Sequence, residues 1–323
     1  MNNLIRRLGN SDVSVSALGL GCWPLAGMTR EGITREDAIA TVRAAYESGV
    51  THFDTAFCYG ENGESERAIA AAIDGKRHSV EFASKCGIHW GADHKQCVNG
   101  QPDRLRHEVE ESLKRLSTDY LDLLYLHAPD PEVPIEESAS ALRGILESGK
   151  AKAIGASNMT VDQLERFHAV CPLSACQMPY NMLQRGIETS VLPWCQKNNV
   201  AMVVYWPLMK GLLTGTMKND RVFPLSDSRH KYPMFKGIEF KKNLAFVDQL
   251  RPIANRLKCA VPDLVLAWTA EQAGITSVLF GATSPHQVHE TVRGMSVTLD
   301  TQAKNDIREA ISARGSIIGR RAV

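Results

Sequence analysis

The run Leu121-Asp122-Leu123-Leu124-Tyr125-Leu126-His127 is short and apolar, and it ends on a histidine suited to chemistry. Four other short, mostly apolar runs end in the same way, at Asp54, Lys85, Asn158 and Gln177. In a (β/α)₈ barrel the carboxyl ends of the parallel strands meet at one face, where side chains from several strands build the active site. This series of strands with polar tips therefore predicts an α/β protein with a TIM-barrel fold.

Strand candidates recur along the chain, with helical patterns between them. Apolar residues at helical spacing follow Asp103, which we expect to cap its helix, and others follow Pro134. The stretch from Thr160 to Gln163 has the pattern of a capping box. Strands that alternate with helices of this length favour a parallel sheet. The eight predicted barrel strands are 17–20, 50–53, 80–84, 121–126, 153–156, 174–177, 201–205 and 277–280.

Two further segments complete the predicted architecture. A turn signal at residues 9–12 separates two short alternating stretches and predicts an N-terminal β-hairpin. Residues 209–240 are punctuated by glycine and proline and predict a long loop over the active face, after the seventh strand. A doubly wound sheet would carry a glycine-rich G-x-G-x-x-G turn, but Gly19 and Gly21 are followed by Pro24, which fits that turn poorly. We therefore predict one barrel domain over residues 1–323.

Composition excludes several classes of protein. The chain has 323 residues, of which 44% are hydrophobic, and a net charge of +1, which gives no electrostatic signature for nucleic acid or a membrane surface. The longest strongly apolar stretch, 200–209, contains Pro207 and is too short to span a bilayer. The first residues lack a secretory apolar core. We expect a cytoplasmic protein that binds neither nucleic acid nor membrane.

The eight cysteines are scattered and contain no C-x-x-C pair, which favours free thiols over a disulfide framework. One group, Cys86, His89, His94 and Cys97, has spacings that metal ligands also use. The arm between the two pairs is shorter than in most zinc sites. We therefore favour a polar loop over the mouth of the barrel and predict no metal.

Asp54, Tyr59, Lys85 and His127 converge if the strand assignments hold. A free phenol has a pKa of about 10 and is a reluctant acid near neutrality. An ammonium beside it favours the phenolate and eases proton release, so we expect Lys85 to lower the pKa of Tyr59. Asp54 would keep Lys85 charged, and His127 would donate a hydrogen bond to a carbonyl oxygen. Such a set can protonate a carbonyl while another group delivers hydride.

Six blocks resemble the signature motifs of the aldo-keto reductases, and they occur in family order. They are 53–60, 83–85, 124–127, 155–158, 177–181 and 205–213. The similarity runs from about residue 5 to the last helix. Within the family, the segment with Phe223, Arg229 and Phe235 is most similar to bacterial general-stress-type reductases and to the potassium-channel β-subunit branch.

The resemblance implies a nicotinamide cofactor extended across the barrel mouth. Ser157, Asn158 and Gln177 would bind its carboxamide, and Tyr205 would stack on its ring. The motif at Ser284-Pro285 is a strong helix start that attracts anions. Arg229 would meet a phosphate. The residues expected to contact the cofactor are Gly21, Trp23, Asp54, Ser157, Asn158, Gln177, Tyr205, Trp206, Pro207, Leu208, Lys210, Gly211, Leu213, Arg229, Gly281, Thr283, Gln287 and Glu290.

The cofactor preference follows from the same resemblance, whereas the expected substrate pocket follows from aromatic residues in the loops after the first three strands, which suit small aldehydes, ketones or sugar faces. Many relatives that prefer NADP carry Lys or Arg where Thr283 or Ser284 stands here; we favour NADP(H) and leave NAD(H) open. The expected activity is reversible reduction of aldehydes, ketones or sugars by an EC 1.1.1.- oxidoreductase. The alternative is a module that binds NADP(H), turns over slowly and reports redox state to a protein partner. The residues expected around a small carbonyl or sugar substrate are Trp23, Phe57, Tyr59, Trp90 and His127.

Overall fold

A closed barrel of eight parallel strands forms the centre of the molecule. The computed structural model describes residues 4–29, 32–224 and 227–317. All eight predicted barrel strands are present, with ends that differ by a few residues, and the alternative of a doubly wound sheet is wrong. In barrel order the strands are β3 (Leu18–Gly21), β4 (His52–Asp54), β5 (Glu81–Cys86), β8 (Leu123–Leu126), β9 (Ile154–Ser157), β10 (Ala175–Pro179), β11 (Ala201–Tyr205) and β12 (Ile275–Phe280).

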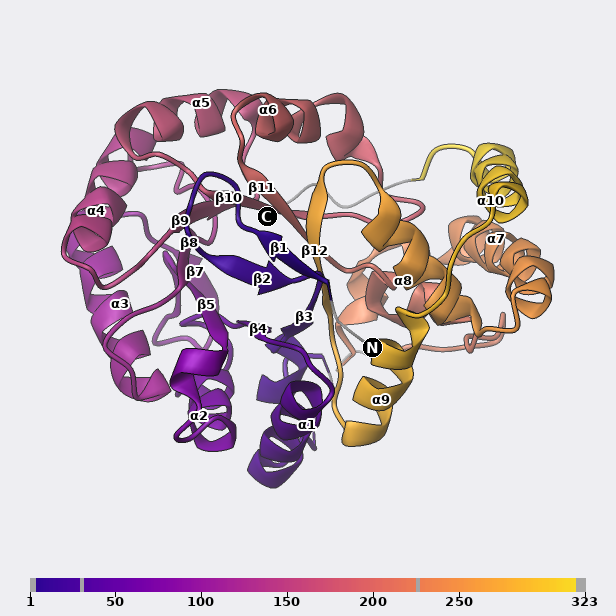
Figure 1. Cartoon of the computed structure of the whole chain (residues 1–323), viewed down its shortest axis with the longest axis horizontal. Helices are drawn as coiled ribbons and strands as arrows, with labels where there is room; N and C mark the ends of the chain where they lie inside the picture. The colour runs from indigo at the N-terminus through magenta and orange to yellow at the C-terminus, as the bar shows by residue number, and fades with distance from the viewer. Residues whose placement is uncertain (1–3, 30–31, 225–226, 318–323) are drawn as a thin grey trace.

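Helices surround the barrel on its outer side (Figure 1). Thr34 and Thr160 cap their helices through capping boxes, the second as predicted. The expected cap at Asp103 is wrong, because Pro102 occupies the first helical position, which suits its fixed φ, and Gln101 is the cap. The helices are α1 (Arg35–Glu47), α2 (Glu64–Ala72), α3 (Pro102–Leu116), α4 (Ile135–Glu147), α5 (Val161–Val170), α6 (Val191–Lys197), α7 (Gly237–Arg256), α8 (Val261–Glu271), α9 (Pro285–Gly294) and α10 (Thr301–Arg314).

The predicted N-terminal hairpin is confirmed. Strands β1 (Ile5–Arg7) and β2 (Ser14–Ser16) pair antiparallel. Leu8 and Val15 are fully buried and pack against inward-facing residues of the barrel strands, so the hairpin covers the end of the barrel opposite the strand tips. Arg6 ties the hairpin to the barrel, since its Nη1 donates to the carbonyl oxygen of Ile275 at 2.9 Å.

A second hairpin replaces part of the expected polar loop after β5. Strands β6 (Ile88–Trp90) and β7 (Gln96–Val98) pair antiparallel, with Ile88 opposite Val98. This hairpin follows Cys86 at the carboxyl end of β5, so it lies on the same face of the barrel as the polar strand tips.

The long excursion after β11 is confirmed, but it ends earlier than predicted. It contains the short 3-10 helices η4 (Met209–Thr214), η5 (Ser228–Lys231) and η6 (Pro233–Phe235), and α7 already begins at Gly237. The apolar end of this segment is anchored by aromatic packing, with the ring centroid of Phe223 lying 5.2 Å from that of Phe235 and 6.1 Å from that of Phe240. No helix in the described ranges is long and apolar enough to cross a membrane.

Two glycines make room for large side chains inside the barrel. A Cβ atom on Gly155 would lie 2.4 Å from ring atoms of the fully buried Tyr125, and one on Gly19 would lie 2.6 Å from the ring of His52. Both distances are far shorter than a van der Waals contact. Large side chains thus fill the barrel interior below the strand tips, and they fit there because the residues next to them are glycines.

We expect Gly155→Ala to destabilise the protein by about 1–3 kcal/mol, because overpacking forces Tyr125 from its place. The matched control is Gly144→Ala, in the interior of α4, where an added Cβ meets nothing within 4 Å. There alanine should stabilise by about 0.5–1 kcal/mol. Urea unfolding of both variants measures the difference, and equal stability of the two would contradict this account of the interior.

Candidate active site

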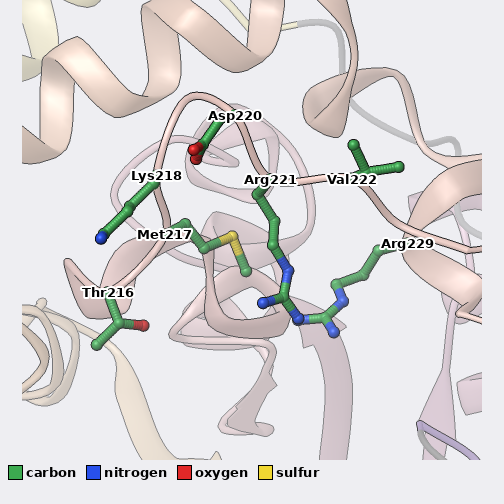
Figure 2. A pocket seen from close by; sticks show the side chains of 7 residues that line it. All are labelled: Thr216, Met217, Lys218, Asp220, Arg221, Val222 and Arg229. Carbon is green, nitrogen blue, oxygen red and sulfur yellow. The ribbon is translucent and has the colours of Figure 1, made fainter.

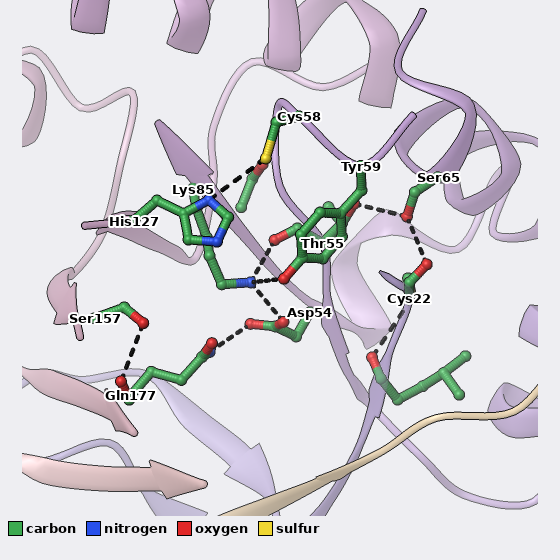
Figure 3. Close-up of polar contacts among 12 residues, drawn as sticks. Cys22, Asp54, Thr55, Cys58, Tyr59, Ser65, Lys85, His127, Ser157 and Gln177 are labelled. Atoms are coloured by element: carbon green, nitrogen blue, oxygen red, sulfur yellow. Dashed lines mark hydrogen bonds and ion pairs between the residues drawn. The ribbon is translucent and has the colours of Figure 1, made fainter. Parts of the chain in front are cut away.

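A buried ion pair lies at the centre of the barrel face where the carboxyl ends of the strands meet. Lys85 Nζ on β5 lies 2.6 Å from Asp54 Oδ1 at the end of β4, and the two side chains are 1% and 3% exposed. The ammonium also donates to the carbonyl oxygen of Thr55 at 2.7 Å. The adjacent strands place these residues together, since β4 and β5 pair in parallel (Figure 3). A buried charge pair of this kind needs further hydrogen bonds to offset its desolvation.

Tyr59, in the loop after β4, is hydrogen-bonded to this ion pair. Lys85 Nζ donates to the Tyr59 phenol oxygen at 3.2 Å, and the ring is only 8% exposed. Burial raises the pKa of Tyr59 well above its usual value, and the Asp54 charge raises it further. Lys85 is the neighbour expected to ease proton release from Tyr59, but the net pKa of Tyr59 is raised, because loss of water around the phenolate dominates. Tyr59 is held as a protonated phenol.

His127 follows β8 and lies beside Tyr59, with ring centroids 5.8 Å apart in an edge-to-face arrangement. Burial lowers the pKa of His127 well below its usual value, and the Lys85 charge lowers it further. The imidazole is therefore neutral near pH 7. A neutral imidazole has one N–H donor and one acceptor nitrogen, so His127 can donate a single hydrogen bond to a neighbouring oxygen.

The tips of the next strands connect to this group. Gln177 Nε2 donates to Asp54 Oδ2 at 2.7 Å, and Ser157 Oγ donates to the Gln177 carbonyl oxygen at 3.0 Å. Asn158 Nδ2 donates to the His127 carbonyl oxygen at 3.1 Å, and Tyr205 donates to Asn158 Oδ1 at 2.8 Å. The residues expected at a carboxamide site are thus brought together with the four catalytic candidates.

Two residues at the strand tips have strained backbone conformations. Asn158 has φ 61° and Trp206 has φ 59°, in the left-handed region that residues with a Cβ rarely adopt. Each conformation costs on the order of 1–2 kcal/mol. Such strain collects where a fold over-determines the position of a functional side chain.

A cavity of about 530 Å³ lies in the excursion after β11. Lys218, Arg221 and Arg229 line it together with Asp220, and Figure 2 shows both guanidinium groups turned to the same side. Arg229, the expected phosphate partner, is paired with Asp227: its Nε lies 2.9 Å from Oδ1 and its Nη2 lies 2.5 Å from Oδ2. The lining thus combines three cationic side chains with one carboxylate, and the Arg229 guanidinium is paired with a second carboxylate, that of Asp227.

Several expected cofactor contacts lie between the catalytic candidates and this cavity, and their side chains are close to one another. Lys210 Nζ lies 4.6 Å above the ring of Trp206 and 5.1 Å above that of Tyr232. Arg229 Nη1 approaches the Lys210 carbonyl oxygen at 3.5 Å. Pro207 and Leu213 are buried, while Leu208 and Gly211 are half-buried. Leu213 is fully buried in the hydrophobic core, which gives no support to its expected contact with the cofactor.

The predicted helix start after β12 is confirmed. Ser284 caps α9 by accepting from the Gln287 amide at 3.4 Å, and Gln287 Oε1 accepts from the Thr283 amide at 2.9 Å. Gly281 is exposed before this cap, and Glu290 lies on α9 with Oε2 3.3 Å from His286 Nδ1. Gly21, at the end of β3, is half-buried. Residues 283–285 at the start of α9 are half-buried, and the Thr283 and Gln287 amides already have acceptors within the chain.

An apolar group surrounds Tyr59 on the side of the expected substrate. Trp23 packs edge-on against Tyr59 with ring centroids 5.0 Å apart, and Trp90 belongs to the same group. Trp90 Nε1 donates to the Cys58 carbonyl oxygen at 3.0 Å. Phe57 lies elsewhere: its ring packs 4.3 Å from the Arg115 guanidinium on α3. The geometry therefore favours Trp23 and Trp90 as pocket walls and gives no support to Phe57.

The four cysteine and histidine residues with metal-like spacing are separated. Cys86 is buried and donates to the Tyr125 carbonyl oxygen, whereas Cys97 is exposed on β7. His94 Nδ1 lies 2.9 Å from Glu61, and His89 Nδ1 lies 3.6 Å from Glu108. Within the described ranges, no three His, Cys, Asp or Glu side chains are grouped as a metal site would need.

Sequence analysis missed two contributors to the site. The Thr55 carbonyl oxygen accepts from Lys85, and the Cys58 thiol lies 3.6 Å from His127 Nδ1. Both residues lie in the short segment between Asp54 and Tyr59. Their closeness in sequence to these two predicted site residues is the signal that could have indicated them.

The barrel with a Lys–Asp pair, a tyrosine and a histidine at its carboxyl face defines a class of oxidoreductases that act on carbonyl groups. Residues 17–312 match the aldo/keto reductase family, and the chain belongs to this family. It is thus an aldo-keto reductase, an oxidoreductase of class EC 1.1.1.- that reduces carbonyl groups with NAD(P)H, as the resemblance implied.

Individual relatives cover nearly the whole chain. It is 38% identical over 303 residues to Aldo-keto reductase YhdN of Bacillus subtilis, covering 93% of this chain and 91% of that protein. It is 33% identical to the NADH-specific methylglyoxal reductase of Escherichia coli, covering 95% and 98%. The solved glycerol dehydrogenase AKR11B4 from Gluconobacter oxydans is similar with a TM-score of 0.91 and 31% identity, covering 100% and 99%.

We expect Asp54→Asn to destabilise the protein by about 3–5 kcal/mol, because it leaves the Lys85 ammonium buried without a carboxylate. Lys85→Met should have a similar cost, since it leaves the carboxylate alone. The double variant should be much less destabilised than the sum of the two. Urea unfolding of the four proteins gives the coupling free energy, and additive losses would contradict the buried pair.

Proposed function

We propose that this protein reduces small aldehydes, ketones or sugars reversibly to alcohols, with NADPH as the preferred cofactor and Tyr59 as the general acid. The observation that carries the proposal is the position of Lys85 Nζ, hydrogen-bonded to both Asp54 and Tyr59 in a buried site. When bound, the nicotinamide cofactor supplies hydride to the carbonyl carbon. The protein's own residues then have to orient the carbonyl oxygen and give it a proton.

Each catalytic candidate has a distinct task in this proposal. Tyr59 gives its phenolic proton to the carbonyl oxygen, and the Lys85 ammonium stabilises the phenolate that results. Asp54 keeps Lys85 charged and aimed at Tyr59. His127, neutral at pH 7, donates a hydrogen bond to the same oxygen and polarises the carbonyl. The raised pKa keeps the Tyr59 proton in place before the reaction, and the Lys85 ammonium, which donates to the phenol oxygen, is the group that would ease its release.

The proposed substrate class follows from the walls of the site. Trp23 and Trp90 provide aromatic surface beside Tyr59, which suits a small uncharged carbonyl compound or the face of a sugar. The relatives' names include a methylglyoxal reductase and a glycerol dehydrogenase, which act in that range of small oxygenated molecules.

The donor set along the barrel mouth fits a nicotinamide dinucleotide. Ser157, Asn158 and Gln177 would hold the carboxamide, and Tyr205 would cover the ring. Arg229 would hold a phosphate after leaving Asp227, and the α9 start at Thr283 and Gln287 would hold the adenosine end. NADPH is the proposed preference; NADH is the second candidate because one relative is named as NADH-specific.

The test is Tyr59→Phe, which removes the acid while keeping the ring. We expect kcat on an aldehyde and ketone panel to fall by about 10²–10⁴, the usual contribution of general acid catalysis. Cofactor affinity, followed by nicotinamide fluorescence, should stay within twofold of wild type (roughly 0.4 kcal/mol). Tyr46→Phe on α1 is the control and should change neither quantity. Full activity of Tyr59→Phe would overturn the assignment of the acid.

The same titrations, run with NADPH and NADH, decide the cofactor. Tighter binding of NADPH supports the proposal, and tighter binding of NADH overturns the preference without affecting the role of Tyr59. Tight cofactor binding with no turnover on the whole panel would instead support the redox-sensing alternative.

A further inference from the structure

Cys58 has no role in the proposed function, yet it contacts one of its catalytic candidates. Its sulfur lies 3.6 Å from His127 Nδ1, within hydrogen-bond distance for a thiol (Figure 3). The side chain is almost completely buried, and Cys58 directly precedes Tyr59 in the chain.

The chemistry of the two groups favours the thiol as the donor in this contact. Burial raises the pKa of Cys58 far above its usual value, so the thiol keeps its hydrogen at every physiological pH. The imidazole of His127 is neutral and has one nitrogen without a hydrogen. A neutral imidazole nitrogen is a much better acceptor than a thiol sulfur. The favoured arrangement is therefore S–H donating to Nδ1.

Hydrogen bonds from other residues hold both Cys58 and His127 in place. The Cys58 carbonyl oxygen accepts from Trp90 Nε1 at 3.0 Å and from Gln96 Nε2 at 3.2 Å, which ties Cys58 to the β6–β7 hairpin. The His127 carbonyl oxygen accepts from Asn158 Nδ2 at 3.1 Å. The contact between the thiol and the imidazole is therefore held by hydrogen bonds from two different parts of the barrel mouth.

We propose that Cys58 is a positioning residue that fixes the tautomer of His127. By donating to Nδ1, the thiol keeps the imidazole hydrogen on Nε2, the nitrogen on the side of Tyr59. Only that tautomer can donate to a carbonyl oxygen that also receives the Tyr59 proton. The proposal rests on the proposed role of His127 in polarising the carbonyl.

The first measurement is the ¹⁵N NMR spectrum of the His127 ring in the wild-type, cofactor-free protein at pH 7. We expect the chemical shift of a protonated Nε2 and of an unprotonated Nδ1. A protonated Nδ1 as the main form would overturn the proposal. Because this readout needs no turnover, its result is independent of whether the protein reduces carbonyl compounds.

Two variants then test whether the thiol is responsible. Cys58→Val removes the donor at similar size, and the ratio of Nε2–H to Nδ1–H should fall roughly fivefold, the usual effect of one neutral hydrogen bond, with a parallel fall in kcat. Cys58→Ser keeps an O–H donor and should restore most of the ratio and of kcat. Cofactor affinity should be unchanged in both. Cys195→Val, at a buried cysteine on α6, is the control for a change in core volume and should alter neither quantity.

Equal losses in Cys58→Val and Cys58→Ser, with the tautomer ratio unchanged, would show that Cys58 acts only by packing and would overturn the proposal. If Tyr59→Phe remained fully active, the proposed function would fail while the tautomer measurement still stood. The two failures are thus distinguishable.

Discussion

The Lys85–Asp54 pair places two opposite charges 2.6 Å apart where water has almost no access. The desolvation of such a pair is offset only when other polar groups complete its hydrogen bonds. Here those groups are the Thr55 carbonyl oxygen, the Gln177 amide and the Tyr59 hydroxyl. Two of them come from the loop after β4 and one comes from β10, so strands on different sides of the barrel have to be in the correct register before the pair is stable. The fold and the charge pair therefore depend on each other.

Exclusion of water shifts the pKa values of the two neighbouring groups in opposite directions. Burial raises the pKa of Tyr59 and lowers that of His127, and in each case the neutral form is favoured. The net effect is that formal charge is concentrated on the Lys85–Asp54 ion pair, while Tyr59 and His127, the two groups proposed to meet the substrate, remain neutral hydrogen-bond donors. An oxygen that gains negative charge between them would meet two donors and a nearby cation, which is the arrangement that stabilises a developing alkoxide.

Much of this architecture could be predicted from sequence because the barrel strands are apolar runs with polar tips, and Asp54, Lys85 and His127 each end or follow such a run. The β6–β7 hairpin could not be predicted, since its strands are three residues long and β7 contains no buried residue. The net direction of the Tyr59 pKa could not be predicted, because the sequence identifies the neighbouring Lys85 but not the loss of water around the phenol. The pairing of Arg229 with Asp227 and the packing of Phe57 on α3 depend on side-chain directions that no sequence pattern encodes.

All eight cysteines lie within the described ranges, and Cys97 alone is exposed there. It lies on β7 beside Gln96, whose amide donates to the Cys58 carbonyl oxygen, so one exposed sulfur lies at the rim of the barrel mouth while the other thiols are shielded to different degrees. A thiol-directed fluorophore would therefore attach chiefly to this hairpin without engineering of the chain. The molecule has a natural attachment point for an optical reporter of what enters the barrel.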